Sequence, residues 1–126
     1  MKKNQTSILI VDDQKFFCSS LEDFLREEGY EANSVHNGYD AIEEVKKNKY
    51  DVVILDVNMP GMDGIKTLSR IKKINNDQIV IMITAREDID TITKSFKEGA
   101  DDYMQKPIAN EELLRILNSA KKSGQS

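Results

Sequence analysis

The sequence predicts a doubly wound α/β domain, in which helices cover both faces of a mostly parallel sheet. Short apolar runs alternate five times with amphipathic helical stretches, and no internal repeat or linker interrupts the alternation. Parallel strands need crossover connections, which helices usually provide. The length of 126 residues suits one domain with its own core. We expect this domain to cover residues 1–122, followed by a polar tail at 123–126.

Strands are predicted where apolar residues, many of them β-branched, run together. The runs at 7–11, 51–56 and 78–84 are strongly apolar, which is typical of strands buried on both faces of a parallel sheet. The run at 31–35 is more polar, so we expect it nearer an edge. Residues 101–105 form a short last strand in this interpretation.

Helices are predicted where apolar residues recur at a spacing of three or four. Gly29 and Gly99 end the first and fourth helices, and Asn110 is expected to cap the fifth. In chain order, the five apolar faces contain Phe17, Leu21, Phe24 and Leu25; Ala41, Ile42 and Val45; Ile65, Leu68 and Ile71 or Ile74; Ile89, Ile92 and Phe96; and Leu113, Ile116 and Leu117.

Composition excludes several classes of protein. The net charge is -4 and no basic stripe is evident, so direct binding of nucleic acid by this segment is not expected. No apolar run approaches the length of a membrane span, and the run at 8–11 is too short for a signal peptide. The single cysteine, Cys18, cannot form an internal disulfide, which suits a reducing compartment. We therefore expect a cytoplasmic domain.

Polar side chains follow four of the predicted strands at their carboxyl ends. Asp12 and Asp13 follow the first strand, Asp56 ends the third, Thr84 ends the fourth, and Lys106 follows the fifth. Ligands of open parallel sheets bind outside the carboxyl ends of the strands. The sequence therefore predicts a site in which these side chains converge.

Carboxylates held close together repel one another, and a hard divalent cation relieves that repulsion. Ligands that are all oxygen suit Mg²⁺, which is usually held by one or two carboxylates together with phosphate oxygens. Neither GxGxxG nor GxxxxGK[ST] is present, so nucleotide binding of those kinds has no support. The pattern indicates a phosphate site that depends on Mg²⁺, with Mn²⁺ as an alternative metal.

A carboxylate is the available nucleophile, because there is no Ser-His pair and the only histidine, His36, follows the polar second strand. Carboxylates form acyl phosphates, and phosphoryl transfer needs mainly positioning and charge neutralisation. Positive charge would come from the metal and the lysine, and a hydrogen bond from the threonine. The loop containing Pro60, Gly61 and Gly64 would let main-chain groups approach the ligand closely.

Four segments, taken in their order, resemble the receiver domains of two-component response regulators: ILIVDDQ, VVILDVNMPGMDG, IMITA and GADDYMQKP. The resemblance covers essentially the whole chain. It implies a flavodoxin-like (βα)5 fold with strand order 2-1-3-4-5.

The resemblance also implies roles for the residues at the site. Asp56 would be the phosphoacceptor, and Asp13, Asp56 and the main-chain carbonyl of Asn58 would bind the metal. Asp12 would act on the metal through bound water. Lys106 would pair with the phosphoryl group, and it precedes Pro107, where the family has a cis peptide bond.

The family works as a two-state switch, and further residues match its moving parts. Thr84 would turn towards the phosphoryl group, and Tyr103 would be the aromatic switch. Asn58 and Arg86 occupy the positions that tune the lifetime of the phosphoryl group. The surface formed by the fourth helix, the fifth strand and the fifth helix would change its conformation.

The implied partners are a histidine kinase or phosphotransfer protein as phosphodonor, and a downstream effector protein or domain. A homodimer through the fourth helix, fifth strand and fifth helix is a further expectation, although Arg115 falls one residue earlier than the arginine those dimers use. The domain would catalyse only its own phosphorylation and dephosphorylation.

The sequence leaves two other functions as alternatives. A Mg²⁺-dependent phosphatase of the haloacid dehalogenase type also attacks from an aspartate at a strand end. It favours a second aspartate two residues later, where this chain has Asn58. A degenerate receiver that binds partners without phosphorylation is the other alternative, against which the complete set of acids, threonine and lysine argues.

Overall fold

The computed structural model describes residues 6–85 and 88–124. Five parallel strands form one sheet in the order β2-β1-β3-β4-β5. The strands are β1 (Ser7–Val11), β2 (Glu31–Val35), β3 (Val52–Asp56), β4 (Ile79–Thr84) and β5 (Asp102–Gln105), and the helices are α1 (Lys15–Glu27), α2 (Gly38–Lys47), α3 (Gly64–Ile74), α4 (Ile89–Lys97) and α5 (Asn110–Gly124). The expected fold class, strand order and edge position of the polar second strand are confirmed.

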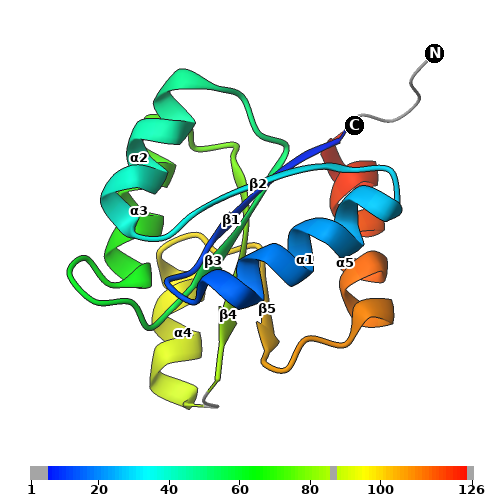
Figure 1. The fold of residues 1–126 in the computed structure, drawn as a ribbon. Helices are drawn as coiled ribbons and strands as arrows, with labels where there is room; N and C mark the ends of the chain where they lie inside the picture. Colours follow the sequence, from blue (N-terminus) through cyan, green and yellow to red (C-terminus); the bar gives the residue numbers. More distant parts are fainter. Residues whose placement is uncertain (1–5, 86–87, 125–126) are drawn as a thin grey trace.

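Helices lie on both faces of the sheet, as Figure 1 shows. Helices α1 and α5 cover one face, and α2, α3 and α4 cover the other. Alternate residues of each central strand enter two separate apolar clusters, because successive side chains of a strand point to opposite faces. In β1, for example, Leu9 joins the cluster under α2 and α3, whereas Ile10 joins the cluster under α1 and α5. The central strands are therefore buried on both sides.

Three strands begin one residue later than the sequence predicts, and polar side chains at those positions explain the difference. The Asp51 carboxylate accepts a hydrogen bond from the Ser7 N–H at 2.8 Å. The Gln78 side chain donates to the Tyr50 carbonyl at 3.0 Å. The Asp101 carboxylate accepts from the Val80 N–H at 2.8 Å. Each of these residues bonds to a neighbouring segment just before its own strand begins.

Two expectations about helices need correction. Asn110 is the first residue of α5 and does not cap it, because the Ala109 carbonyl accepts the first helical hydrogen bond, from the Leu113 N–H at 3.0 Å. The fourth helix forms as expected, but its apolar residues are not a core face: Ile89 is 76% exposed and Phe96 is 45% exposed. Its buried residue is Ser95, whose hydroxyl donates to the Thr91 carbonyl.

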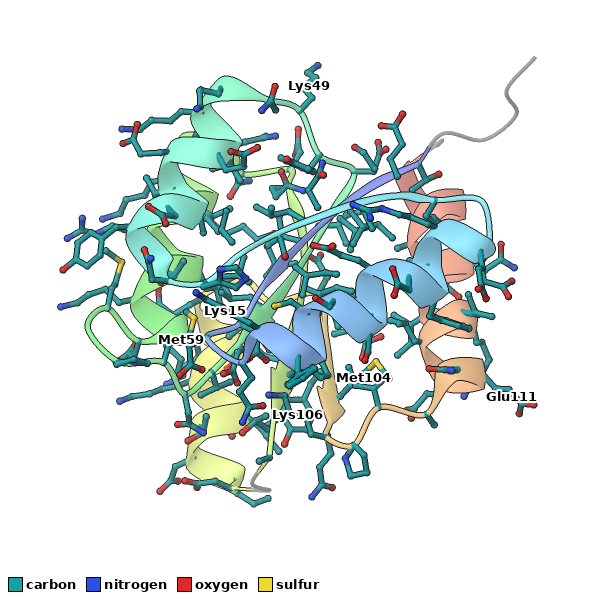
Figure 2. The ribbon with its side chains drawn as sticks, viewed as in Figure 1. Lys15, Lys49, Met59, Met104, Lys106 and Glu111 are labelled. Carbon is teal, nitrogen blue, oxygen red and sulfur yellow. The ribbon has the colours of Figure 1, made fainter. Side chains whose placement is uncertain are left out.

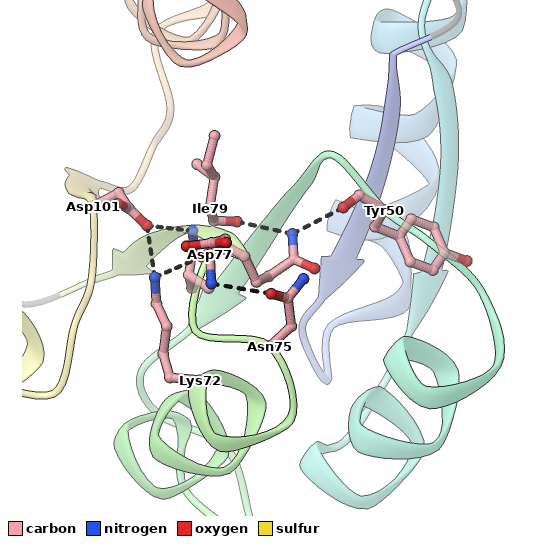
Figure 3. A network of polar contacts seen from close by, with 8 residues as sticks. Tyr50, Lys72, Asn75, Asp77, Ile79 and Asp101 are labelled. Atoms are coloured by element: carbon pink, nitrogen blue, oxygen red, sulfur yellow. Dashed lines mark hydrogen bonds and ion pairs between the residues drawn. The ribbon is translucent and has the colours of Figure 1, made fainter. Parts of the chain in front are cut away.

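A polar network joins α3, β4 and β5 at the amino ends of the strands (Figure 3). The Lys72 ammonium donates to the Gln78 carbonyl at 2.5 Å and lies 3.1 Å from the Asp101 carboxylate. The same carboxylate oxygen accepts from the Val80 N–H. This network holds the start of β5 against β4, at the opposite end of the sheet from Asp12 and Asp56. Within the described residues, no helix is both long and apolar enough to cross a membrane.

Replacement of Asp101 by alanine should lower the free energy of unfolding by about 1–2 kcal/mol, because the Val80 N–H loses its acceptor. The ion pair with Lys72 adds little, since the Asp101 side chain is 44% exposed. Urea unfolding measures the change. Asp77→Ala is the matched control: Asp77 is exposed, and only its main-chain N–H makes a hydrogen bond among the described contacts. Equal losses in both variants would contradict this account of Asp101.

Candidate functional site

The register of the sheet brings two acidic side chains together. Val11 pairs with Leu55 across β1 and β3, so the residues that follow, Asp12 and Asp56, emerge next to each other at the carboxyl ends of these strands. Asp12 is 0% exposed and Asp56 is 4% exposed. Two carboxylates this deeply buried are rare unless paired or bound to a metal. Their burial therefore points to a binding site.

Asp13 completes a cluster of three carboxylates. One carboxylate oxygen each from Asp12, Asp13 and Asp56 lies within 4.8 Å of the others. Asp13 is exposed, so the cluster opens to solvent on that side. Hard oxygen donors at such mutual distances match the ligand set of Mg²⁺ or Mn²⁺. The predicted convergence of these three residues is thus present in the structure.

Lys106 reaches the cluster from the end of β5. Its ammonium lies 2.7 Å from Asp12 Oδ2 and donates to Gln14 Oε1 at 3.1 Å. The contact with Asp12 is an ion pair without hydrogen-bond geometry, and among the described residues Oδ2 has no hydrogen-bond partner. The other oxygen of Asp12 accepts from the Gln14 N–H at 2.9 Å. Figure 2 shows Lys106 beside the first half of α1.

The Asp56 carboxyl is electrostatically strained. Its pKa is raised from 3.8 to about 6, mainly by burial and in second place by the neighbouring Asp12 carboxylate. Lys106 and the Asn58 N–H oppose the shift without cancelling it. A cation bound next to Asp56 would stabilise its ionised form.

Asn58 and Thr84 lie on the other side of Asp56. The Asn58 N–H points to Asp56 Oδ1 at 3.4 Å, and its side-chain amide to the Thr84 hydroxyl at 3.5 Å. Both distances are long for hydrogen bonds, so these two contacts are weak. Asp56 pairs with Ile83 across β3 and β4, which places Thr84 one residue beyond the acid. Thr84 is buried, as a strand-end residue facing the site would be.

Close packing restricts which residues can occupy the loop after β3. A Cβ atom at Gly64 would lie 2.1 Å from the Asp56 carbonyl oxygen, so only glycine lets α3 begin this close to β3. Gly61 has φ +81°, a conformation that glycine adopts readily. Met59 and Met62 of the same loop are buried, whereas Pro60 is exposed. Asp63 caps α3 by accepting from the Lys66 N–H at 2.9 Å.

The remaining predicted residues are placed as follows. Tyr103 lies in the middle of β5, half-buried against the core cluster on the side of α2 and α3. The Lys106-Pro107 peptide bond is cis, which the sequence alone could not establish. Arg86, the second predicted lifetime position, lies outside the described residues.

Two residues at the site were missed on the sequence. Gln14 bonds to Lys106, and the ring of Phe17 lies under the same ammonium, with Nζ 4.5 Å from the ring centroid. The sequence predicts for Phe17 only a place in the apolar face of the first helix. The available signal was its position one helical turn after Asp13, which brings its side chain to the same end of the sheet.

The comparison with protein families agrees with this geometry. The model of the response regulator receiver domain family matches residues 8–118. The chain belongs to this family. It is therefore a signalling domain of the two-component type, as the sequence motifs indicated.

Curated relatives carry the same domain within longer proteins. The transcriptional regulatory protein ZraR of Klebsiella oxytoca is 38% identical over 120 residues, which are 95% of this chain and 27% of that protein. PrrA of Mycobacterium tuberculosis is 35% identical over 107 residues, 85% of this chain and 46% of that protein. The chain thus spans from about a quarter to about half of the length of these relatives.

Solved structures share the fold over nearly the whole chain. A two-component response regulator from Clostridium difficile superposes with a TM-score of 0.93 at 29% identity, covering 97% of this chain and 100% of the other. A CheY-like receiver domain protein from Methanospirillum hungatei gives a TM-score of 0.91 at 25% identity, with coverages of 97% and 98%. The flavodoxin-like arrangement is therefore that of known receiver domains.

The raised pKa of Asp56 predicts a pH dependence of stability in metal-free buffer. The folded state binds the Asp56 proton more tightly than the unfolded state, whose pKa is near 3.8, so the free energy of unfolding should fall as pH rises from 3.8 to about 6. Asp56→Asn should remove this fall and be more stable than the wild type at pH 7.5, by on the order of 1–3 kcal/mol.

Chemical unfolding across pH in the presence of a chelator measures both effects. Asp63→Asn serves as a control, because Asp63 is exposed and its side chain bonds to the Lys66 N–H and to neither buried acid. A wild-type profile that is flat over this range, or an Asp56→Asn variant less stable than the wild type at pH 7.5, would contradict the prediction.

Proposed function

We propose that the domain is a phosphorylation-controlled switch that accepts a phosphoryl group on Asp56 from the phosphohistidine of a histidine kinase or phosphotransfer protein. One observation carries the proposal: a buried carboxylate at the end of β3 lies among two further acids, a lysine and a threonine. An oxygen of Asp56 would form the new bond to phosphorus while the bond between phosphorus and the histidine nitrogen breaks. The proposed domain covers residues 1–122, with 123–126 as its tail, and works in the cytoplasm.

Asp13, Asp56, the main-chain carbonyl of Asn58 and, through water, Asp12 are the proposed holders of a divalent cation. The three converging carboxylates and the uncompensated charge of Asp56 support Mg²⁺ there, with Mn²⁺ as an alternative. When bound, the cation would neutralise negative charge on the carboxylates and on the incoming phosphoryl oxygens.

The chain's own residues would then hold the phosphoryl group. Lys106 would pair with a phosphoryl oxygen, since its ammonium already lies at the acidic cluster. The Thr84 hydroxyl would donate to another, since Thr84 ends β4 one residue after Ile83, the partner of Asp56 across the sheet. Asn58 and Arg86 would tune how long the acyl phosphate survives before hydrolysis resets the domain.

The signal would leave through α4, β5 and α5. Tyr103 lies on β5 only three residues before Lys106, so a change at the lysine can reach it along one short strand. The exposed Ile89 and Phe96 give α4 an apolar surface on which an effector, or a second copy of this domain, can bury area. Phosphorylation would act by favouring the conformation that binds the partner more tightly.

Acetyl phosphate with Mg²⁺ should add one phosphoryl group to the wild-type domain and none to Asp56→Asn. Intact-mass spectrometry measures the addition, and peptide mapping locates it. Asp51→Asn, which changes an acid at the opposite end of β3, should be labelled like the wild type. Multiple turnover of a phosphate ester would favour the phosphatase alternative, and no labelling of the wild type would favour a degenerate receiver.

Removal of one proposed metal ligand should weaken Mg²⁺ binding strongly. We expect Asp13→Asn to raise the Kd for Mg²⁺ at least about tenfold, because a ligand carboxylate of a hard cation is lost. Calorimetric titration measures it without any phosphodonor. Asp23→Asn, an exposed acid further along α1, is the control and should bind like the wild type. Equal affinity in the two variants would remove Asp13 from the site.

A further inference from the structure

The ammonium of Lys106 is held by groups from one short segment, at the junction of β1 and α1. Asp12 provides a carboxylate at 2.7 Å and Gln14 a side-chain carbonyl at 3.1 Å. Phe17 provides the face of its ring, 4.5 Å from Nζ to the centroid. The Lys106 side chain is 15% exposed, so these contacts form in partly desolvated surroundings.

The ring contact differs in kind from the other two. The face of an aromatic ring carries partial negative charge and attracts a cation, more strongly where water is excluded. Asp12 pairs with the ammonium through a negative charge, whereas the neutral ring attracts it without adding negative charge to the site. Lysine carries its charge on a flexible four-carbon chain, so such a contact also restricts where that charge can be.

We propose that Phe17 is a positioning residue: its ring face keeps the Lys106 ammonium at the acidic cluster, in place for the phosphoryl oxygens that arrive at Asp56. The link to phosphorylation rests on the proposed function, but the contact between Phe17 and Lys106 does not. Phe17 does not touch the reacting atoms and acts only through Lys106.

A simple packing role is the alternative, and the chain offers a matched residue to separate the two. Phe17 and Phe24 both line a pocket of about 580 Å³ between α1 and the segment after β5. Both are half-buried against the same apolar cluster. Of the two, Phe17 is the one whose ring lies under Lys106 in the described structure. Substitution of Phe24 therefore reports on packing alone.

Nuclear magnetic resonance tests the contact without any phosphodonor. The aromatic ring current should shift the Lys106 side-chain methylene signals next to the ammonium upfield from those of exposed lysines. Phe17→Leu should abolish that shift, and Phe24→Leu should leave it in place; Lys106→Gln assigns the signals. Unshifted Lys106 signals in the wild type would overturn the contact itself.

Stepwise fluorination of the ring tests the role in phosphorylation, because fluorine weakens the attraction of the ring for a cation while changing its shape little. With one, two and three fluorines introduced site-specifically at Phe17, the rate of phosphorylation by acetyl phosphate with Mg²⁺ should fall progressively, by about two- to fivefold in total. Phe17→Trp should retain the wild-type rate. The same fluorinated series at Phe24 should leave the rate unchanged.

Equal rates across the Phe17 series, or the same decline in the Phe24 series, would overturn the positioning role. Thermal unfolding of each protein verifies that it is folded. If the wild type accepts no phosphoryl group at all, the proposed function fails, and with it the role of Phe17 in phosphorylation; the magnetic resonance result still decides whether the ring holds Lys106.

Discussion

The site depends on one constraint: two neighbouring parallel strands end in carboxylates that the fold buries side by side. The pairing of β1 with β3 forces Asp12 and Asp56 together, and their burial keeps water from screening their repulsion. Lys106 compensates only in part, since Asp56 retains a raised pKa. The folded chain thus keeps an excess of negative charge at this edge of the sheet, where a cation would bind favourably.

The rest of the fold supplies the rigidity that such an arrangement needs. Apolar residues bury β1, β3 and β4 on both faces, so the ends of these strands cannot drift apart to relieve the repulsion. Gly64 lets α3 start directly against the Asp56 carbonyl, which holds the loop close to the end of β3. The rigid strands thus hold the acids in place even though the burial of Asp56 is unfavourable for its charged form.

The strands and the convergence of the acids, Thr84 and Lys106 were predictable from sequence, because a continuous apolar run and the polar residue that ends it are local patterns. The details that failed depend on contacts between distant segments. Asp51, Gln78 and Asp101 bond to other segments, and each of their strands begins one residue later than predicted. The exposure of Ile89 and Phe96 depends on how α4 packs against the sheet. The ring of Phe17 under Lys106 joins residues 89 positions apart, and no periodicity reveals such a pair.

The hydrogen bonds of Asp101 give β5 two unlike ends. At its start, the strand is tied to β4 and to Lys72 of α3; at its finish, it leads within one residue to the lysine at the acidic rim. Between these ends β5 pairs in register with β4 from Asp102 to Gln105, and beyond it the Lys106 N–H donates to the Thr84 carbonyl at 2.8 Å. The main chains that carry the lysine and the threonine are thus joined directly, so neither can shift without the other, and Tyr103 belongs to the same hydrogen-bonded edge of the sheet.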